Sequence, residues 1–333
     1  MSTAVSSRIS AVQPLRAIEG GRVTILGDAL FSGERLPDIT IGSISARMAC
    51  ASPQSLTAVV PGGLDGGPTP IRMDSAPGET AYVEIGAPIA TGLHQVDNPV
   101  FDADGNLYVT FSGSRGQQAP VSIYLVGRDG TRQPFVTDLP NPTSMTYGPD
   151  GGLYVSSRFE GSVHRVGPGG DVSTYATHLG VACGLAFGPD GKLYVGDRSG
   201  SILVVDNGKA TQFAAIPPSV AAFHLAFGPD GFLYVSAPTL APRDVIYRVS
   251  PSGVVDACAE GFGRPQGLAF DARGMLYVAD SIAGASALYR MAVDRPAARE
   301  RLLEGGGLIG LAFDPRGGVA VASSDTVFRF DAF

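Results

Sequence analysis

Residues 184–196 read GLAFGPDGKLYVG, in which two short apolar runs flank a turn that ends in glycine. The proline presets the first central φ angle of such a turn, the aspartate tolerates the second, and the glycine takes the left-handed conformation that closes a hairpin. Two further apolar runs follow, at 201–205 and 211–215. The stretch therefore predicts a unit of four short antiparallel strands that begins with a tight hairpin.

The same pattern occurs six times after residue 95. Its copies are separated by 46, 40, 40, 43 and 43 residues and begin at Phe101, Tyr147, Phe187, Phe227, Phe270 and Phe313. Four strands in each of six such repeats predict a β-propeller, because only closure into a ring hides the apolar faces of every repeat. We therefore expect an all-β chain with a six-bladed propeller over residues 86–333.

The sixth repeat ends early. It has apolar runs at about 311–313, 319–322 and 326–330, and the sequence then stops at Phe333. The segment 87–93, which precedes the first repeat, reads as a fourth strand without a sheet of its own. We expect it to pair with 326–330, so that it completes the last blade and closes the ring.

Residues 1–85 contain no copy of the repeat, and they alternate short apolar strands with Gly, Pro and Ser turns. Three stretches, ISAVQP from Ile9, EGGRVTILG from Glu19 and SLTAVVP from Ser55, resemble an IPT/TIG immunoglobulin-like domain. The resemblance implies a small N-terminal immunoglobulin-like β-sandwich that serves as a spacer or interaction module.

Composition limits both the fold and the partners. With 45 Gly and 25 Pro, the chain has little room for helices of three turns. The formal net charge is −7 and no run of Lys or Arg occurs, which disfavours nucleic acid as a partner. No stretch is long and apolar enough for a membrane-spanning helix, so we expect no membrane insertion. A small molecule or a protein segment remains as the expected partner.

Cysteine usage and the first residues bear on the compartment. Cys50, Cys183 and Cys258 lie far apart, so they predict neither a disulfide framework nor a zinc site. Residues 1–10 lack the apolar core of a signal peptide. The cytoplasm is the default expectation, and a secreted origin stays open.

The repeats resemble the NHL and SMP-30/gluconolactonase group of six-bladed propellers over roughly residues 87–333, through the turn followed by Leu-Tyr-Val. In such a ring, ligands meet the loops before the first strand and after the second strand of each blade. The Gly-Pro-Asp-Gly turns lie on the opposite face. Propellers host hydrolases, lyases, isomerases and binding modules, so the residues at the channel mouth decide the function.

The gluconolactonase-like resemblance implies a divalent metal held by a Glu, Asn residues and an Asp that precede the first strands. The corresponding positions here are Asp97 with Asn98 beside it, Thr143, Cys183, Phe223, Gln266 and Ile309. A Ca²⁺ or Mg²⁺ ion needs several oxygen ligands. In this register only Asp97, with Asn98 beside it, is positioned to be a metal ligand. Asp197 and Asp280 are the candidate replacements for the missing ligands. The ligand set is incomplete, so a divalent cation is kept only as an alternative and no cofactor is assigned.

The other polar side chains near the channel mouth form the candidate ligand site, namely Asn98, Arg115, Arg158, Asp197, Arg198, Gln266 and Asp280. Arginine can hold a carboxylate or phosphate through two parallel hydrogen bonds. His224, at the start of a first strand, is the candidate catalytic acid or base. The alternative is that Arg158, Asp197 and Arg198 form ion pairs between blades and that His224 is a satisfied buried histidine.

Two functions are consistent with these residues. The first is a ligand-binding propeller that recognises a small polar or anionic ligand, or a protein segment, at the channel mouth. The second is a lactonase-like hydrolase or lyase at the same site, with His224 as base, Arg158 and Arg198 as anchors, and any metal near Asp97. The incomplete metal set favours binding, and the enzyme is kept as the alternative.

Overall fold

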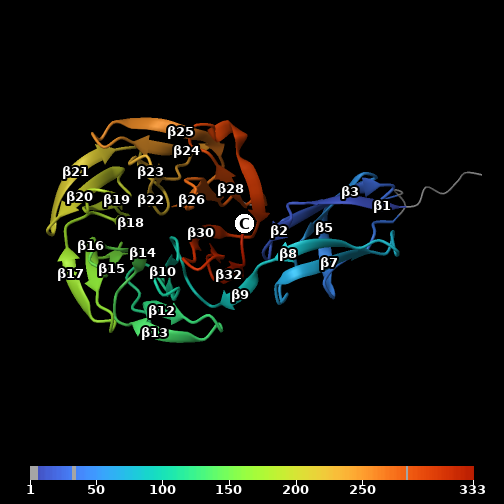
Figure 1. The fold of residues 1–333 in the computed structure, drawn as a ribbon, viewed down its shortest axis with the longest axis horizontal. Helices are drawn as coiled ribbons and strands as arrows, with labels where there is room; N and C mark the ends of the chain where they lie inside the picture. Colours follow the sequence, from blue (N-terminus) through green and yellow to red (C-terminus); the bar gives the residue numbers. More distant parts are fainter. Residues whose placement is uncertain (1–6, 32–34, 283) are drawn as a thin grey trace, which may run out of the picture.

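The chain is almost entirely β-structure and has two parts, a ring of sheets and a smaller group of N-terminal strands beside it (Figure 1). The computed structural model describes residues 7–31, 35–282 and 284–333. Within these ranges, the only helix is a single 3-10 turn, η1 (Pro296–Ala298). No helix in the described part of the chain is long and apolar enough to cross a membrane.

Five separate four-stranded antiparallel sheets form most of the ring. Four of them follow the chain in order from the inner to the outer strand. These are β10 (Val100–Phe101), β11 (Leu107–Thr110), β12 (Ile123–Val126) and β13 (Arg132–Val136); β14 (Pro142–Tyr147), β15 (Leu153–Ser157), β16 (Ser162–Val166) and β17 (Val172–Ala176); β18 (Ala182–Phe187), β19 (Leu193–Asp197), β20 (Ser201–Asp206) and β21 (Lys209–Ala215); and β22 (His224–Phe227), β23 (Leu233–Ser236), β24 (Asp244–Val249) and β25 (Val255–Phe262).

The fifth separate sheet joins the two ends of the ring. It consists of β30 (Leu308–Phe313), β31 (Val319–Ser323), β32 (Val327–Phe330) and β9 (Ala87–Ala90). Strand β9 pairs antiparallel with β32, with Val327 opposite Ala90 and Arg329 opposite Ala87. This is the pairing that the sequence predicts between segments 87–93 and 326–330, and it closes the ring with main-chain hydrogen bonds.

The repeat that begins at Phe270 does not form a separate sheet. Its strands β26 (Pro265–Phe270), β27 (Leu276–Asp280), β28 (Ala287–Met291) and β29 (Glu300–Glu304) are one end of a twelve-stranded sheet. Strand β29 pairs in parallel with β2 (Arg16–Ala17), which continues the sheet into the N-terminal strands. The structure therefore has five separate blades rather than the six predicted, because β2 covers the outer edge that β29 would otherwise expose.

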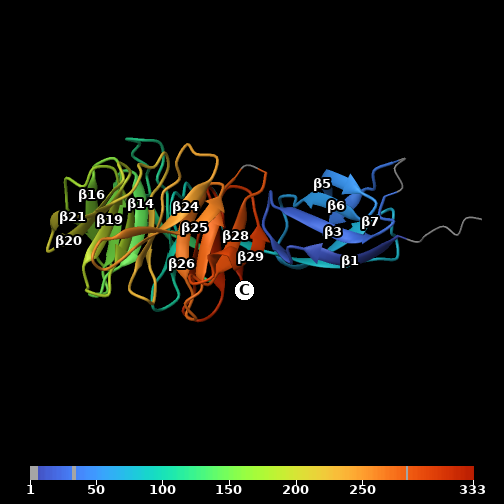
Figure 2. The same cartoon turned by 90° about the horizontal axis from the view of Figure 1, so that it is seen from above.

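The N-terminal strands have a core of their own. They are β1 (Arg8–Gln13), β3 (Arg22–Asp28), β4 (Ile39–Ile41), β5 (Ile44–Ser52), β6 (Ser55–Val59), β7 (Gly67–Met73) and β8 (Ala81–Ile85), paired in the order β1-β3-β6-β5-β4-β7-β8-β2. Alternate residues point inward, and Val23, Ile25, Leu56 and Ile71 are fully buried. Figure 2 shows this part beside the edge of the ring that carries β28 and β29.

The repeated aromatic residues explain why neighbouring sheets pack together. The Tyr of each Leu-Tyr-Val run meets the first aromatic residue of the next repeat edge-on, as in the pair Tyr194 and Phe227, whose ring centroids are 5.0 Å apart. The hydroxyl of the same Tyr194 donates to the turn aspartate, Asp190, over 3.3 Å. Gly191 closes that turn with φ of 75°. One motif therefore fixes both the hairpin and its neighbour.

Candidate functional site

One face of the ring holds a cavity of about 350 Å³. Its walls come from residues that precede or begin the inner strands or that follow the second strands, which is the face that the sequence predicts for ligands. The polar residues that line it are Thr143, Arg158, Arg198, Arg264, Gln266 and Ser281. No Asp or Glu is among the described residues of its wall. We call it the arginine cavity.

Two of its arginines are half-buried and anchored by the main chain. Arg158 follows β15 and donates through Nη2 to the carbonyl of Gly113 over 2.9 Å. Arg198 follows β19 and donates through Nη2 to the carbonyl of Val220 over 2.9 Å. Burial lowers the pKa of Arg158, and the nearby guanidinium groups of Arg198 and Arg115 lower it further. The cavity wall has no carboxylate among its described residues, so the cavity gathers positive charge.

Two further arginines belong to loops of this face, and only Arg115 is predicted from the sequence, whereas Arg264 is not. Arg264 precedes β26, lines the cavity and is exposed. Arg115 is exposed on the loop after β11 and is not part of the cavity wall. Arg115 therefore contributes at longer range, through its charge beside Arg158.

The predicted acidic ligand residues are not among the wall residues, and they hold neighbouring loops in place. Asp197 accepts hydrogen bonds from the Val181 amide over 2.8 Å and from the Ser199 hydroxyl. Asp280 accepts from the amides of Gly263, over 2.9 Å, and Arg264, over 2.6 Å. Both carboxylates are buried at the ends of second strands and bind loop amides of their own sheets. The sequence places them near the mouth but not in this role.

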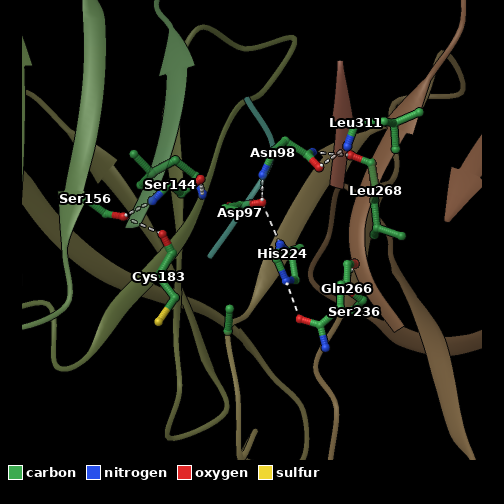
Figure 3. Close-up of polar contacts among 12 residues, drawn as sticks. Asp97, Asn98, Ser144, Ser156, Cys183, His224, Ser236, Gln266, Leu268 and Leu311 are labelled. Atoms are coloured by element: carbon green, nitrogen blue, oxygen red, sulfur yellow. Dashed lines mark hydrogen bonds and ion pairs between the residues drawn. The ribbon is translucent and has the colours of Figure 1, made fainter. Parts of the chain in front are cut away.

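A buried polar contact links the segment before β10 to β22 and β26 (Figure 3). His224, at the start of β22, donates through Nδ1 to Oδ1 of Asp97 over 2.6 Å. On its other side, Nε2 lies 3.4 Å from Oε1 of Gln266. The side chain of His224 has no exposed surface, and Asp97 and Gln266 are buried. Of the three, only Gln266 reaches the cavity wall.

Asn98 joins two inner strands rather than facing a ligand. Its Nδ2 donates to the carbonyl of Leu268 over 2.7 Å, and its Oδ1 accepts from the amide of Leu311 over 3.1 Å (Figure 3). The adjacent Gly267 and Gly310 leave the space that the Asn98 side chain fills. The amide therefore ties β26 to β30 at the channel centre.

Two serines that the sequence analysis did not single out act in the same way. The Ser156 hydroxyl donates to the carbonyl of Cys183 over 2.6 Å, and the Ser236 hydroxyl donates to the carbonyl of Gln266 over 2.5 Å. Each serine ends or nearly ends a second strand and reaches the next inner strand. The signal is present in the sequence as a Ser directly after Leu-Tyr-Val at both positions. Burial raises the pKa of the Cys183 thiol to about 12.

The residues present do not fit the divalent metal that the propeller resemblance implies. No group of three or more His, Cys, Asp or Glu side chains able to hold a metal occurs in residues 7–31, 35–282 and 284–333. Oδ1 of Asp97 already accepts from His224 and from the amide of Asn98, over 2.7 Å. Asp197 and Asp280, the predicted substitutes, are bound to loop amides. We derive no step through a metal.

Comparison with known proteins places the repeats in a family. A family model described as "SMP-30/Gluconolactonase/LRE-like region" matches residues 142–333. No curated protein sequence matches this chain significantly.

Several solved structures share the fold. A putative gluconolactonase is 18% identical with a TM-score of 0.59, covering 73% of this chain and 90% of its own. An auxiliary nutrient binding protein from Bacteroides thetaiotaomicron is 13% identical with a TM-score of 0.56, covering 98% of both chains. A catalytically inactive virginiamycin B lyase from Staphylococcus aureus, solved with quinupristin, is 16% identical with a TM-score of 0.53, covering 89% and 100%. At these identities the similarity shows the fold alone.

Proposed function

Since the chain belongs to the SMP-30/gluconolactonase/LRE-like family, we propose that it is a propeller that binds a small anionic ligand in the arginine cavity. One observation carries the proposal: Arg158, Arg198 and Arg264 line a cavity that has no carboxylate among its described wall residues. A planar guanidinium binds a carboxylate or phosphate with matched geometry. The chain as a whole has a net charge of −7, so this concentration of positive charge is local.

The hydrogen bonding of Arg198 supports the same proposal. Its Nε is buried and has no hydrogen-bond partner among the described residues. A buried donor without a partner costs about 1–3 kcal/mol. An anion in the cavity would offset that cost, and the low dielectric of a partly buried site would strengthen the attraction.

The alternative is a lactonase-like hydrolase or lyase at the same site, and the contact between His224 and Asp97 favours it. A carboxylate that orients a histidine is a common arrangement for an acid or base. Against this, the His224 side chain is fully buried, and Gln266 separates it from the cavity. A base must come within hydrogen-bond reach of the proton that it removes. We therefore place binding first.

The domain boundaries belong to the same proposal. We infer that residues 1–85 form an IPT/TIG-like immunoglobulin sandwich and that residues 86–333 form the propeller. Strands β26–β29 would then complete the ring as a sixth set of four, because β26 contacts both β22 and β30. The N-terminal part would hold the propeller in position through β2 and β29.

Calorimetric titration tests the binding function. We expect a panel of small anions (citrate, gluconate, phosphate and octanoate) to contain at least one that binds, and the Arg158→Gln and Arg198→Gln variants to weaken it roughly tenfold to a hundredfold. Arg295→Gln is the matched control, because Arg295 is exposed, lies outside the cavity wall and pairs with its neighbour Asp294. Binding that is unchanged in both cavity variants would exclude the site.

An assay of lactone and ester turnover tests the alternative on the same variants. If the protein is an enzyme, His224→Ala abolishes turnover and leaves the affinity for a non-hydrolysable anion within about threefold of the wild-type value. If no lactone or ester is consumed, the enzyme alternative is excluded.

A further inference from the structure

The arginine cavity is only half polar. The other residues of its wall are Val96, Cys183, Val220, Ala221, Ala222 and Ile309. None of these six side chains forms a strong hydrogen bond with a hydroxyl-rich ligand. A wall of this kind fits a ligand whose charge is confined to one end and whose remainder is apolar.

Three large apolar side chains are exposed on loops of the same face. Val220 is 37% exposed at the cavity, Leu240 is 88% exposed on the loop after β23, and Phe159 is 50% exposed directly after Arg158. Single exposed apolar residues are ordinary on protein surfaces. These three are informative because they belong to loops that follow second strands or precede an inner strand, as the cavity wall does.

Hydrogen bonds connect the apolar loops to the arginines. The guanidinium of Arg198 holds the carbonyl of Val220, and the amide of Val220 donates to the carbonyl of Pro238 over 2.9 Å. Pro238 lies two residues before Leu240. The Ser219 hydroxyl also donates to Pro238, over 2.9 Å. The anion-binding side chain and the exposed leucine are therefore parts of one fixed loop pair.

We propose that the ligand is an amphipathic carboxylate, with its charged group between Arg158 and Arg198 and its apolar chain along Val220 toward Leu240. This inference rests on the proposed anion-binding function and names the class of ligand. The cavity volume of about 350 Å³ is at the small end of ligand sites, which range over about 300–1,000 Å³. A chain of several carbon atoms would then reach from the arginines to the rim.

The test is a calorimetric titration with straight-chain carboxylates of equal charge, from acetate through butanoate and hexanoate to octanoate, with gluconate as the hydrophilic counterpart. Full burial of a methylene group contributes about 0.8 kcal/mol, so we expect affinity to rise about twofold to fourfold for each added carbon. Leu240→Ser should weaken octanoate at least threefold and leave acetate and gluconate unchanged. Val254→Ser is the control, because Val254 is also exposed (58%) but lies in the outer hairpin between β24 and β25.

The outcomes separate the two proposals. If affinity does not depend on chain length while Arg158→Gln and Arg198→Gln still weaken binding, the amphipathic ligand is excluded and the anion site stands. If neither the carboxylates nor the other anions of the panel bind, both proposals fail. If Leu240→Ser and Val254→Ser weaken octanoate equally, the apolar rim is not the contact.

Discussion

The two faces of the ring are built from the same strands and differ in almost everything else. On the hairpin face, five turns repeat one arrangement, in which a Tyr hydroxyl donates to the turn aspartate, as Tyr234 does to Asp230 over 2.8 Å. On the other face, the loops differ from sheet to sheet and carry Arg158, Arg198 and Arg264. Residues shared by the repeats therefore build the blades, and residues that depart from the repeat build the site.

The two faces also differ in how much free energy of unfolding is lost when one of their polar contacts is removed. Of the five turn aspartates, Asp150, Asp190 and Asp230 are exposed and Asp102 and Asp271 are half-buried, so water can replace a lost partner. The contact between His224 and Asp97 is buried and joins β22 to the segment before β10, and β22 and β10 lie across the ring from each other (Figure 1). Two pairs of variants and one labelling experiment test whether the cavity face depends on specific buried contacts more than the hairpin face does.

The largest loss of stability is expected for Asp97→Ala. This substitution leaves Nδ1 of the fully buried His224 and the amide of Asn98 without their acceptor. Removing one partner of a buried pair costs about 3–5 kcal/mol, so the free energy of unfolding should fall by that amount in a urea titration. Asp230→Ala, in a hairpin turn, is the matched control and should lose only about 1 kcal/mol. Equal losses for the two variants would remove the distinction between the faces.

A smaller loss of stability than for Asp97→Ala is expected for glycine substitutions. A Cβ at Gly267 would lie 2.7 Å from the Cα of Gly310 and 2.8 Å from the carbonyl oxygen of Ile309, so the inner strands must shift. Gly267→Ala should cost about 2–3 kcal/mol. Gly231→Ala, in a hairpin turn with φ of 78° and nothing within 4 Å of the added atom, should cost about 1–2 kcal/mol. Thermal unfolding of both variants measures their losses of stability. A greater loss for Gly231→Ala than for Gly267→Ala would contradict the prediction.

The sequence predicts the hairpin face well because its information is local. The turn at 188–191 and the Leu-Tyr-Val run sit within a dozen residues of each other, and their repetition fixes the strand pairing. The closing strand 87–93 is also predictable, because the last repeat lacks a fourth strand. The continuation of β29 into β2 is not, because it pairs residues nearly 290 positions apart and no repeat encodes it.

The candidate site is predicted only in part, for a related reason. The sequence identifies Arg158, Arg198 and Gln266 as residues of the channel mouth, and the cavity wall contains them. It does not reveal that Asp197 and Asp280 bind loop amides or that Asn98 ties two strands. Those roles depend on which way each side chain turns, and the register of a strand does not determine that for residues at its end.

The smallest effect is expected for chemical modification of the cavity wall. Burial raises the pKa of Cys183 to about 12, although Cys183 lines the arginine cavity. The thiolate is the reactive form, so at pH 8 Cys183 stays in its thiol form and iodoacetamide should leave it unmodified. Exposed Cys50 is the internal control and should react within minutes. Mass spectrometry of the native protein measures both sites. Rapid labelling of Cys183 would mean that the cavity is more open and more hydrated than its contacts indicate, and the argument that its arginines act at low dielectric would then fail.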